Sequence, residues 1–247
     1  MAFVETHFHL LPGLDDGPAD MQDTIELARA ALADGTGTII ATPHVHGGFV
    51  TDVTVLPERV EEVRAALCRA GVQVSVLCGG ELAHPMVPRL THAELELIAH
   101  GPPGRRWLLL EAPLDDFDSG FTDASAELRR QGFGLVIAHP ERALAATPEA
   151  WPMIEHELSA GAMVQLNAWS LLGHHGAEAA DLAAEFIQRD DPFVLASDAH
   201  GPRRPPSLRR GLEELASLGH PRPECATRTP QSLLEYGFPV LAAAAVA

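Results

Sequence analysis

The segment VETHFHLLPGLDDG, residues 4–17, places two histidines on either side of one phenylalanine, before a Pro-Gly turn and two aspartates. Alternate side chains of an extended strand point to the same face, so His7 and His9 would converge while Phe8 packs into the opposite layer. Converging imidazoles beside a carboxylate could hold a divalent metal ion. They could equally form a hydrogen-bonded pair beside a polar loop, so the rest of the sequence must decide.

Other residues of ligand type stand where further strands are expected to end, and this repetition favours a metal site over isolated core histidines. The candidates are five histidines and four carboxylates: His7, His9, Asp16, His44, Glu81, Glu111, His139, Asp198 and His200. Such a mixture suits zinc, manganese or iron, whereas carboxylates alone would favour magnesium or calcium. Nine ligands exceed the need of one ion, so we expect two or three ions that share a bridging carboxylate.

The remaining histidines lack this placement at strand ends. We assign them to loops and surface: His84, His92, His100, His156, His174, His175 and His220. His46 lies two residues after His44 and is also left outside the ligand set.

Strand-like and helix-like segments alternate along most of the chain, which predicts an α/β fold with a parallel sheet covered on both faces. Seven strands are expected, the first around His7 and the others within residues 36–44, 71–81, 105–113, 132–142, 161–169 and 191–200. Helices are expected at residues 21–35, 57–71, 122–131, 148–160, 177–189 and 207–218. In a closed β/α barrel the carboxyl ends of the strands share one rim, where ligands distant in sequence would meet.

The composition excludes several kinds of chemistry. All 17 basic residues are arginine, and a chain without lysine cannot form a Schiff base, a pyridoxal-phosphate anchor, a Walker A phosphate site or a carbamylated-lysine metal bridge. The formal net charge of −17 argues against a nucleic-acid partner, because nucleic-acid binding needs a basic surface.

Length, hydropathy and cysteine usage predict one large cytoplasmic domain over residues 1–247. The chain lacks an apolar run of about 18 residues and a signal peptide, so no direct membrane insertion is expected. Its last stretch, FPVLAAAAVA, is too short to span a bilayer and is expected to be buried. The three cysteines form no CxxC motif, which fits a reducing compartment.

Taken in order, the motifs THFHLLPGLDDG, TIIATPH, LCGGEL, LLLEAP, VIAHPER and ASDAHGPRRPP cover roughly the first 210 residues. Their series resembles the PHP (polymerase and histidinol phosphatase) family, and most closely its bacterial manganese-dependent protein tyrosine phosphatases of the CpsB/YwqE type. The resemblance implies a distorted (β/α)7 barrel with a metal cluster at the carboxyl-terminal rim of its strands. Manganese is the first expectation for the metal, with iron or zinc as alternatives.

The resemblance also implies how the ligands are shared. One ion would be held by His7, His9, Glu81 and Asp198, and Glu81 would bridge to a second ion held by Glu111 and His139. The third ion would be held by Asp16, His44 and His200.

The activity implied by the resemblance is hydrolysis of phosphotyrosine in proteins by attack of a metal-bound hydroxide. The expected substrate and partner is a bacterial tyrosine kinase of capsule or exopolysaccharide synthesis. Arg142 and Arg204 would bind the phosphate, and His200 would assist catalysis. Because the segment GPRRPP is short, Arg203 could take the place of Arg204, and the glycine- and valine-rich residues 45–56 could alter specificity.

Several alternatives stay open. A PHP phosphatase for a small phosphomonoester such as histidinol phosphate is the nearest, and a non-catalytic metal-binding barrel is another. An amidohydrolase is disfavoured by the missing lysine. A cysteine-dependent phosphatase is excluded, because no cysteine is followed by an arginine six positions later, as its phosphate-binding loop requires.

Overall fold

The computed structural model describes residues 1–114 and 117–238, and the strands among them pair only in parallel. One sheet has the order β1-β2-β4 and the other the order β3-β5-β6-β7-β8-β9. The strands are β1 (Phe3–Glu5), β2 (Thr36–Ala41), β3 (His44–Val45), β4 (Ser75–Cys78), β5 (Glu81–Ala83), β6 (Trp107–Glu111), β7 (Gly134–Ala138), β8 (Met163–Asn167) and β9 (Phe193–Ala196). The predicted parallel α/β architecture is therefore confirmed.

Two of the predicted strands are each divided into two short ones, which is why the described strands outnumber the seven predicted. Residues 36–44 form β2 and β3, separated at Pro43, which has no N–H to continue a ladder. Residues 71–81 contain β4 and β5, separated at Gly79 and Gly80. A Cβ at either glycine would lie 2.7 Å from a neighbouring side chain, so only glycine allows this close approach. The division lets β2 and β4 form a sheet with β1 while β3 and β5 join the larger sheet.

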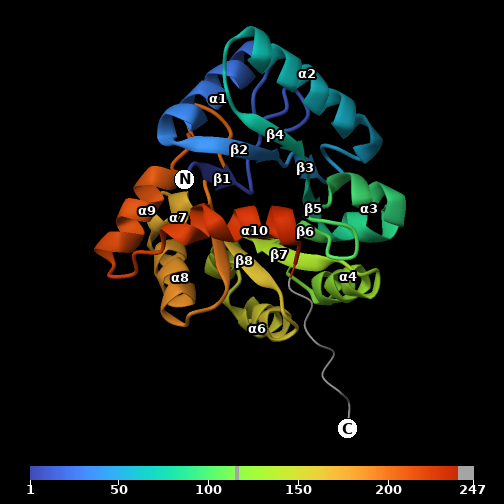
Figure 1. Ribbon diagram of the computed structural model, residues 1–247. Coiled ribbons are helices and arrows are strands. Elements are labelled where there is room, and N and C mark those ends of the chain that lie inside the picture. The colour runs from blue at the N-terminus through green and yellow to red at the C-terminus, as the bar shows by residue number, and fades with distance from the viewer. Residues whose placement is uncertain (115–116, 239–247) are drawn as a thin grey trace.

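Helices cover the outer faces of both sheets, with α1 and α2 beside β2 and β4, and α4, α6 and α8 outside β6 to β8 (Figure 1). Their bounds are α1 (Met21–Asp34), α2 (Leu56–Arg69), α3 (His92–Ile98), α4 (Ser119–Arg130), α5 (Pro140–Ala146), α6 (Trp151–Ser159), α7 (Ala168–Leu171), α8 (Ala177–Gln188), α9 (Leu208–Ser217) and α10 (Arg228–Tyr236). All six predicted helices are present, and α3, α5, α7 and α10 were not predicted.

The apolar side chains form two layers because successive residues of a strand point to opposite sides. Ile40, Leu109, Val136 and Val194, from four different strands, share an inner cluster. The residues beside them in sequence pack outward in the larger cluster beneath the helices. Helix α10 adds Leu233 to the inner cluster and crosses the middle of the view in Figure 1. It thus covers one end of the strands.

The first and last strands approach each other beyond their ladders. Phe8 forms an isolated parallel bridge with Ala199, supported by hydrogen bonds from His9 N to Ala199 O (3.0 Å) and from Asp198 N to His7 O (3.1 Å). Among the described residues, the strand pairing gives two sheets and not one continuous closed ladder.

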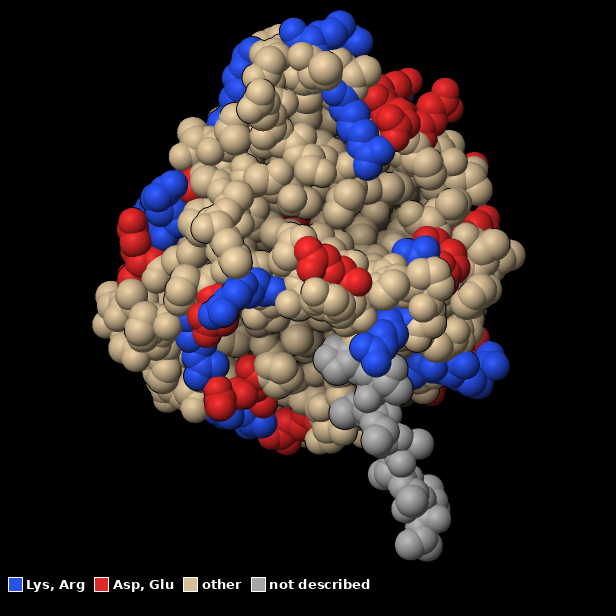
Figure 2. Space-filling view, viewed as in Figure 1, with Lys and Arg blue, Asp and Glu red and all other residues tan. Residues whose placement is uncertain are grey.

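Figure 2 shows arginine and acidic side chains interspersed over the face that carries α10, with no broad basic area in the part drawn in colour. No described helix has both the length and the apolar character needed to cross a membrane. The predicted burial of the terminal segment is seen at Phe238, while residues 239–247 lie outside the described part of the chain.

Candidate metal centre

The nine predicted ligands meet at the carboxyl ends of the strands. Their side chains form four overlapping groups, and within each group the potential ligand atoms lie within 4.8 Å of one another. The groups are His7–His9–Asp198, His7–Glu81–His139, His44–Glu81–Glu111 and His9–Asp16–His44–His200. No other His, Cys, Asp or Glu among the described residues belongs to such a group.

Hydrogen bonds fix which nitrogen of His7 and His9 faces the cluster. His9 Nδ1 lies 2.7 Å from Asp15 Oδ2, and His7 Nδ1 lies 2.9 Å from Gln165 Oε1, which also faces the backbone N–H of His139. Both oxygens are acceptors, so each Nδ1 carries a proton and each Nε2 is the nitrogen left to bind a metal ion. The two Nε2 atoms face each other at 3.1 Å.

Two carboxylates converge on the same point. Glu81 Oε2 and Asp198 Oδ1 each lie 3.2–3.4 Å from the Nε2 atoms of His7 and His9. Burial opposes a charge on His9, but its hydrogen bonds to Asp15, Asp198 and Glu81 raise the His9 pKa well above its usual range, so without a metal ion protons hold these groups together. A divalent cation could take the place of those protons. The residues therefore fit a divalent metal ion, and the hydrogen-bonded Nδ1 atoms supply the support that metal-binding histidines usually have.

Glu81 is the shared member of the cluster. Its Oε1 lies 2.8 Å from His139 Nε2 and its Oε2 lies 2.8 Å from His44 Nδ1. Burial opposes its ionisation, but the surrounding histidines, His7 and His44 foremost, hold the Glu81 pKa well below its usual range. An ionised carboxylate between two sets of histidines could bridge two ions, which is the role that the family resemblance implies for Glu81.

Glu111 groups with His44 and Glu81, whereas His139 groups with His7 and Glu81. The expected pair of Glu111 and His139 thus does not share one group in this arrangement. His139 has a left-handed backbone (φ 34°), which turns its ring toward Glu81. Burial, followed by the nearby charge of Glu81, raises the Glu111 pKa to about 8.

The third expected set is extended by His9. Asp16 Oδ1 lies 3.1 Å from His200 Nε2 and 3.5 Å from His44 Nε2, and the rings of His9 and His200 stack with centroids 3.6 Å apart. Asp16 is more than half exposed, so this edge of the cluster opens toward solvent.

Two arginines lie against the cluster. Arg142 Nη1 is 3.2 Å from Asp198 Oδ2, and Arg204 Nη2 is 3.2 Å from Asp198 Oδ1. Arg204 also contacts the His200 ring, whereas Arg203 is exposed and lines a neighbouring pocket. The geometry therefore favours Arg204 over Arg203 as the second arginine of the site.

Sequence reasoning missed the residues that orient these ligands. Asp15 supports His9, Gln165 supports His7, and Asn167 Nδ2 donates to Asp198 Oδ2 at 2.8 Å. The available signal was the polar pair at alternate positions near the end of the apolar segment 161–169. His100 was wrongly assigned to the surface: it is buried against Trp107, because its segment bridges to the start of β6. His46 is exposed and outside every ligand group, as predicted.

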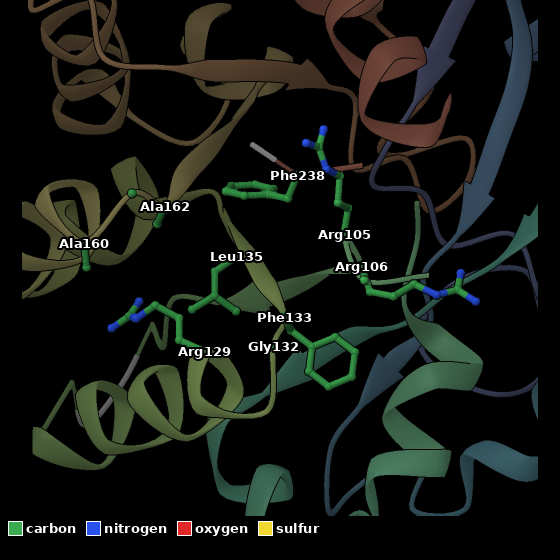
Figure 3. Close-up of a pocket in the computed structure, with 12 residues that line it drawn as sticks. Arg105, Arg106, Arg129, Gly132, Phe133, Leu135, Ala160, Ala162 and Phe238 are labelled. Carbon is green, nitrogen blue, oxygen red and sulfur yellow. The ribbon is translucent and has the colours of Figure 1, made fainter. Parts of the chain in front are cut away.

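Pockets adjoin the cluster on two sides. One, of about 480 Å³, includes His44 and Glu111 in its lining, and another, of about 530 Å³, includes His200 and Arg203. A different pocket of about 370 Å³, shown in Figure 3, lies at the amino ends of β7 and β8 and contains Phe238 but none of the nine ligands. The first two are thus the candidates for substrate binding.

Comparisons with known proteins identify the family of this chain. A family model described as "Capsular polysaccharide synthesis, CpsB/CapC" matches residues 3–220. Tyrosine-protein phosphatase YwqE of Bacillus subtilis (strain 168) is 30% identical over 200 residues, covering 80% of this chain and 77% of that protein. CapC of Staphylococcus aureus is 28% identical over 212 residues, covering 85% and 81% of the two chains.

Among solved structures, one superposes with a TM-score of 0.79 and 28% identity, covering 95% of this chain and 96% of the other. That structure is one of the crystal structures of YwqE from Bacillus subtilis and CpsB from Streptococcus pneumoniae, which are described as "unique metal-dependent tyrosine phosphatases".

Proposed function

We propose, from the premise that this chain belongs to the CpsB/CapC family of capsular polysaccharide synthesis, that it is a metal-dependent phosphatase acting on phosphotyrosine in proteins. Membership of that family confirms the resemblance drawn from the motifs. For the fold, we propose a single domain over residues 1–247 in which the two parallel sheets together form a distorted (β/α)7 barrel. In this barrel β2 with β3, and β4 with β5, each count as one strand.

The observation that carries the proposal is the convergence of nine side chains of ligand type, with Nε2 of His7 and of His9 facing two carboxylates. We infer two or three divalent ions, manganese first and iron or zinc as alternatives, with Glu81 shared between them. Ions bound there would lower the pKa of water toward neutrality and compensate the charge of a phosphoryl group.

The chain's own cationic groups would hold the substrate. Arg142 and Arg204 present guanidinium groups at the edge of the cluster, where planar forks can bind two phosphate oxygens. His200 lies between Asp16 and Arg204 and beside the exposed edge of the cluster, where the ion that it would hold could stabilise the departing oxygen. A phenolate leaving group has a pKa near 10, so hydrogen bonding can stabilise it without a strong acid.

The cysteines do not fit a thiolate mechanism. Burial raises the pKa of Cys78 to about 11 and that of Cys225 to about 12, so both thiols stay protonated near neutral pH. Cys68 is exposed on α2 and belongs to none of the ligand groups.

The proposed substrate is a phosphotyrosine segment of a bacterial tyrosine kinase that serves capsule or exopolysaccharide synthesis. Support comes from the family match and from the names of the relatives. The protein would act in the cytoplasm, where its three free cysteines suit a reducing environment.

Parallel assays would test this function. The metal-stripped protein should be inactive, and after reconstitution with manganese it should hydrolyse a phosphotyrosine peptide with a higher kcat/KM than histidinol phosphate. A clear preference for histidinol phosphate would favour the small-substrate alternative. Binding of metal without hydrolysis of either ester would favour a non-catalytic role.

A further inference from the structure

The pocket of about 480 Å³ beside His44 has an aromatic side chain on its wall, Phe49. We propose that this pocket binds the phenyl ring of the phosphotyrosyl residue and that Phe49 is a specificity-determining residue for aryl phosphates. The inference rests on the proposed function, because it assigns the leaving group of that reaction to one side of the cluster.

Phe49 is held in an exposed position by its local backbone. The side chain is 46% exposed, and it is the only exposed phenylalanine or tryptophan among the described residues. Phe49 N donates to His46 O at 2.9 Å, His46 N donates to Val50 O at 3.1 Å, and Val50 is buried in the core. The turn is therefore anchored on both sides, and the solvent-facing aromatic ring needs an explanation other than packing.

The pocket is continuous with the metal centre. The ring of Phe49 lies nearly parallel to that of His44, with centroids 5.3 Å apart and an interplanar angle of 20°. His44 and Glu111 line the pocket and also belong to the ligand group that contains Glu81. A phosphate held at that group would direct its ester substituent into the space beside Phe49.

The other walls favour a neutral ring. Ala83, Pro85, Pro113 and Leu114 supply apolar surface, which stabilises an aromatic group more than a polar or anionic one. The polar part of the lining is Asp118, which would disfavour an additional negative charge, together with Glu111 and the imidazoles of His44, His46 and His84. An ammonium group could be attracted by Asp118, so a cationic ester such as histidinol phosphate is the competing occupant.

The pocket on the His200 side has a different character. Pro202, Pro205 and Pro206 line it together with Arg203, and the ring among its lining residues is the imidazole of His200. That ring already stacks on His9, with centroids 3.6 Å apart, and no phenylalanine, tyrosine or tryptophan of the described residues lines this pocket, so the structure assigns the phenyl group to the Phe49 side.

The experiment measures binding instead of turnover. The probes are a peptide containing phosphonomethylphenylalanine, a phosphotyrosine analogue that cannot be hydrolysed, and inorganic phosphate, each titrated into the manganese-loaded protein. Phe49→Ala should raise Kd for the peptide about three- to tenfold, from the usual strength of an aromatic pair, while Kd for inorganic phosphate stays within about twofold. Phe49→Trp should restore the wild-type preference. Tyr236→Ala, an exposed aromatic on α10, is the matched control and should change neither constant.

Unchanged peptide binding in Phe49→Ala would overturn the inference, and so would equal weakening of peptide and phosphate, which would indicate damage to the cluster. If the wild-type protein binds histidinol phosphate more tightly than the peptide, and Asp118→Asn removes this preference, the pocket belongs to the cationic ester. Hydrolysis separates the two proposals. A wild-type protein that binds the peptide through Phe49 but does not hydrolyse phosphotyrosine would refute the proposed function alone.

Discussion

Asp15 is expected to control metal affinity without being a ligand. Its Oδ2 accepts from His9 Nδ1 at 2.7 Å and from His44 N at 3.1 Å, and its Oδ1 accepts from Gly17 N at 3.0 Å. In Asp15→Asn, one end of the side chain becomes an NH₂ group. If the NH₂ group faces Gly17, it meets the backbone N–H of Gly17, which is also a donor. If it faces His9, Nδ1 must accept a hydrogen bond, and the imidazole proton moves to Nε2, where the metal should bind.

Loss of such a supporting partner typically weakens metal binding about 10- to 100-fold, equivalent to roughly 1.4–2.7 kcal/mol. Competition with a fluorescent chelator, starting from metal-stripped protein, measures the manganese affinity directly. Asp20→Asn is the control: Asp20 caps α1 away from the cluster and asparagine caps equally well, so the affinity should stay within about twofold. Wild-type affinity in Asp15→Asn would refute the argument that this hydrogen bond fixes the His9 tautomer.

Three further predictions concern the arginines, the thiols and a buried acid. Arg142→Ala and Arg204→Ala should each lose roughly ten- to a thousandfold in kcat/KM while retaining metal, whereas kcat/KM of Arg203→Ala should stay within about threefold of wild type. Steady-state kinetics combined with metal analysis measures both quantities. A larger loss in Arg203→Ala than in Arg204→Ala would contradict the site. Replacing all three cysteines with alanine or serine should change the rate by only a few-fold, and a loss above about a hundredfold in folded protein would restore a thiolate mechanism. Burial raises the Glu5 pKa from 4.5 to about 8, so the contribution of this acid to stability is present below pH 4.5 and is lost as the pH rises toward 8. As the pH rises from 4.5 to 8, the free energy of unfolding of metal-free Glu5→Gln should increase by roughly 2–5 kcal/mol relative to that of the wild type, as measured by denaturant unfolding. A difference between the two free energies that does not change with pH would show that Glu5 ionises normally in the fold.

The convergence of the nine side chains could be predicted because strand ends are visible in the sequence. An apolar run that stops at His139 or Glu111 marks the end of a strand, and parallel strands bring those ends to one edge. Each of these steps uses local information only. The strand expected around His7 was placed too late in the chain, because β1 ends at Glu5, but the parallel bridge of Phe8 to Ala199 still leaves Nε2 of His7 facing Nε2 of His9.

The supporting residues and the strand breaks could not be predicted in the same way, because they depend on contacts between distant segments. Gln165 becomes recognisable only when its oxygen is seen 2.9 Å from His7, 158 positions away in sequence. The break at Gly79 follows from the close approach of Ile40 and His100, and His100 is buried for the same reason. Helix α10 lacked a strong sequence signal and gains stability by placing Leu233 in the inner cluster.

The most direct test of the account is a titration of metal-stripped protein with manganese while phosphate release from a phosphotyrosine peptide is followed. We predict no release before manganese is added and a rise in rate that levels off at two or three bound ions per chain. Full activity in protein verified to be free of metal would contradict the account, and so would a rate that stays at zero after two or three ions have bound.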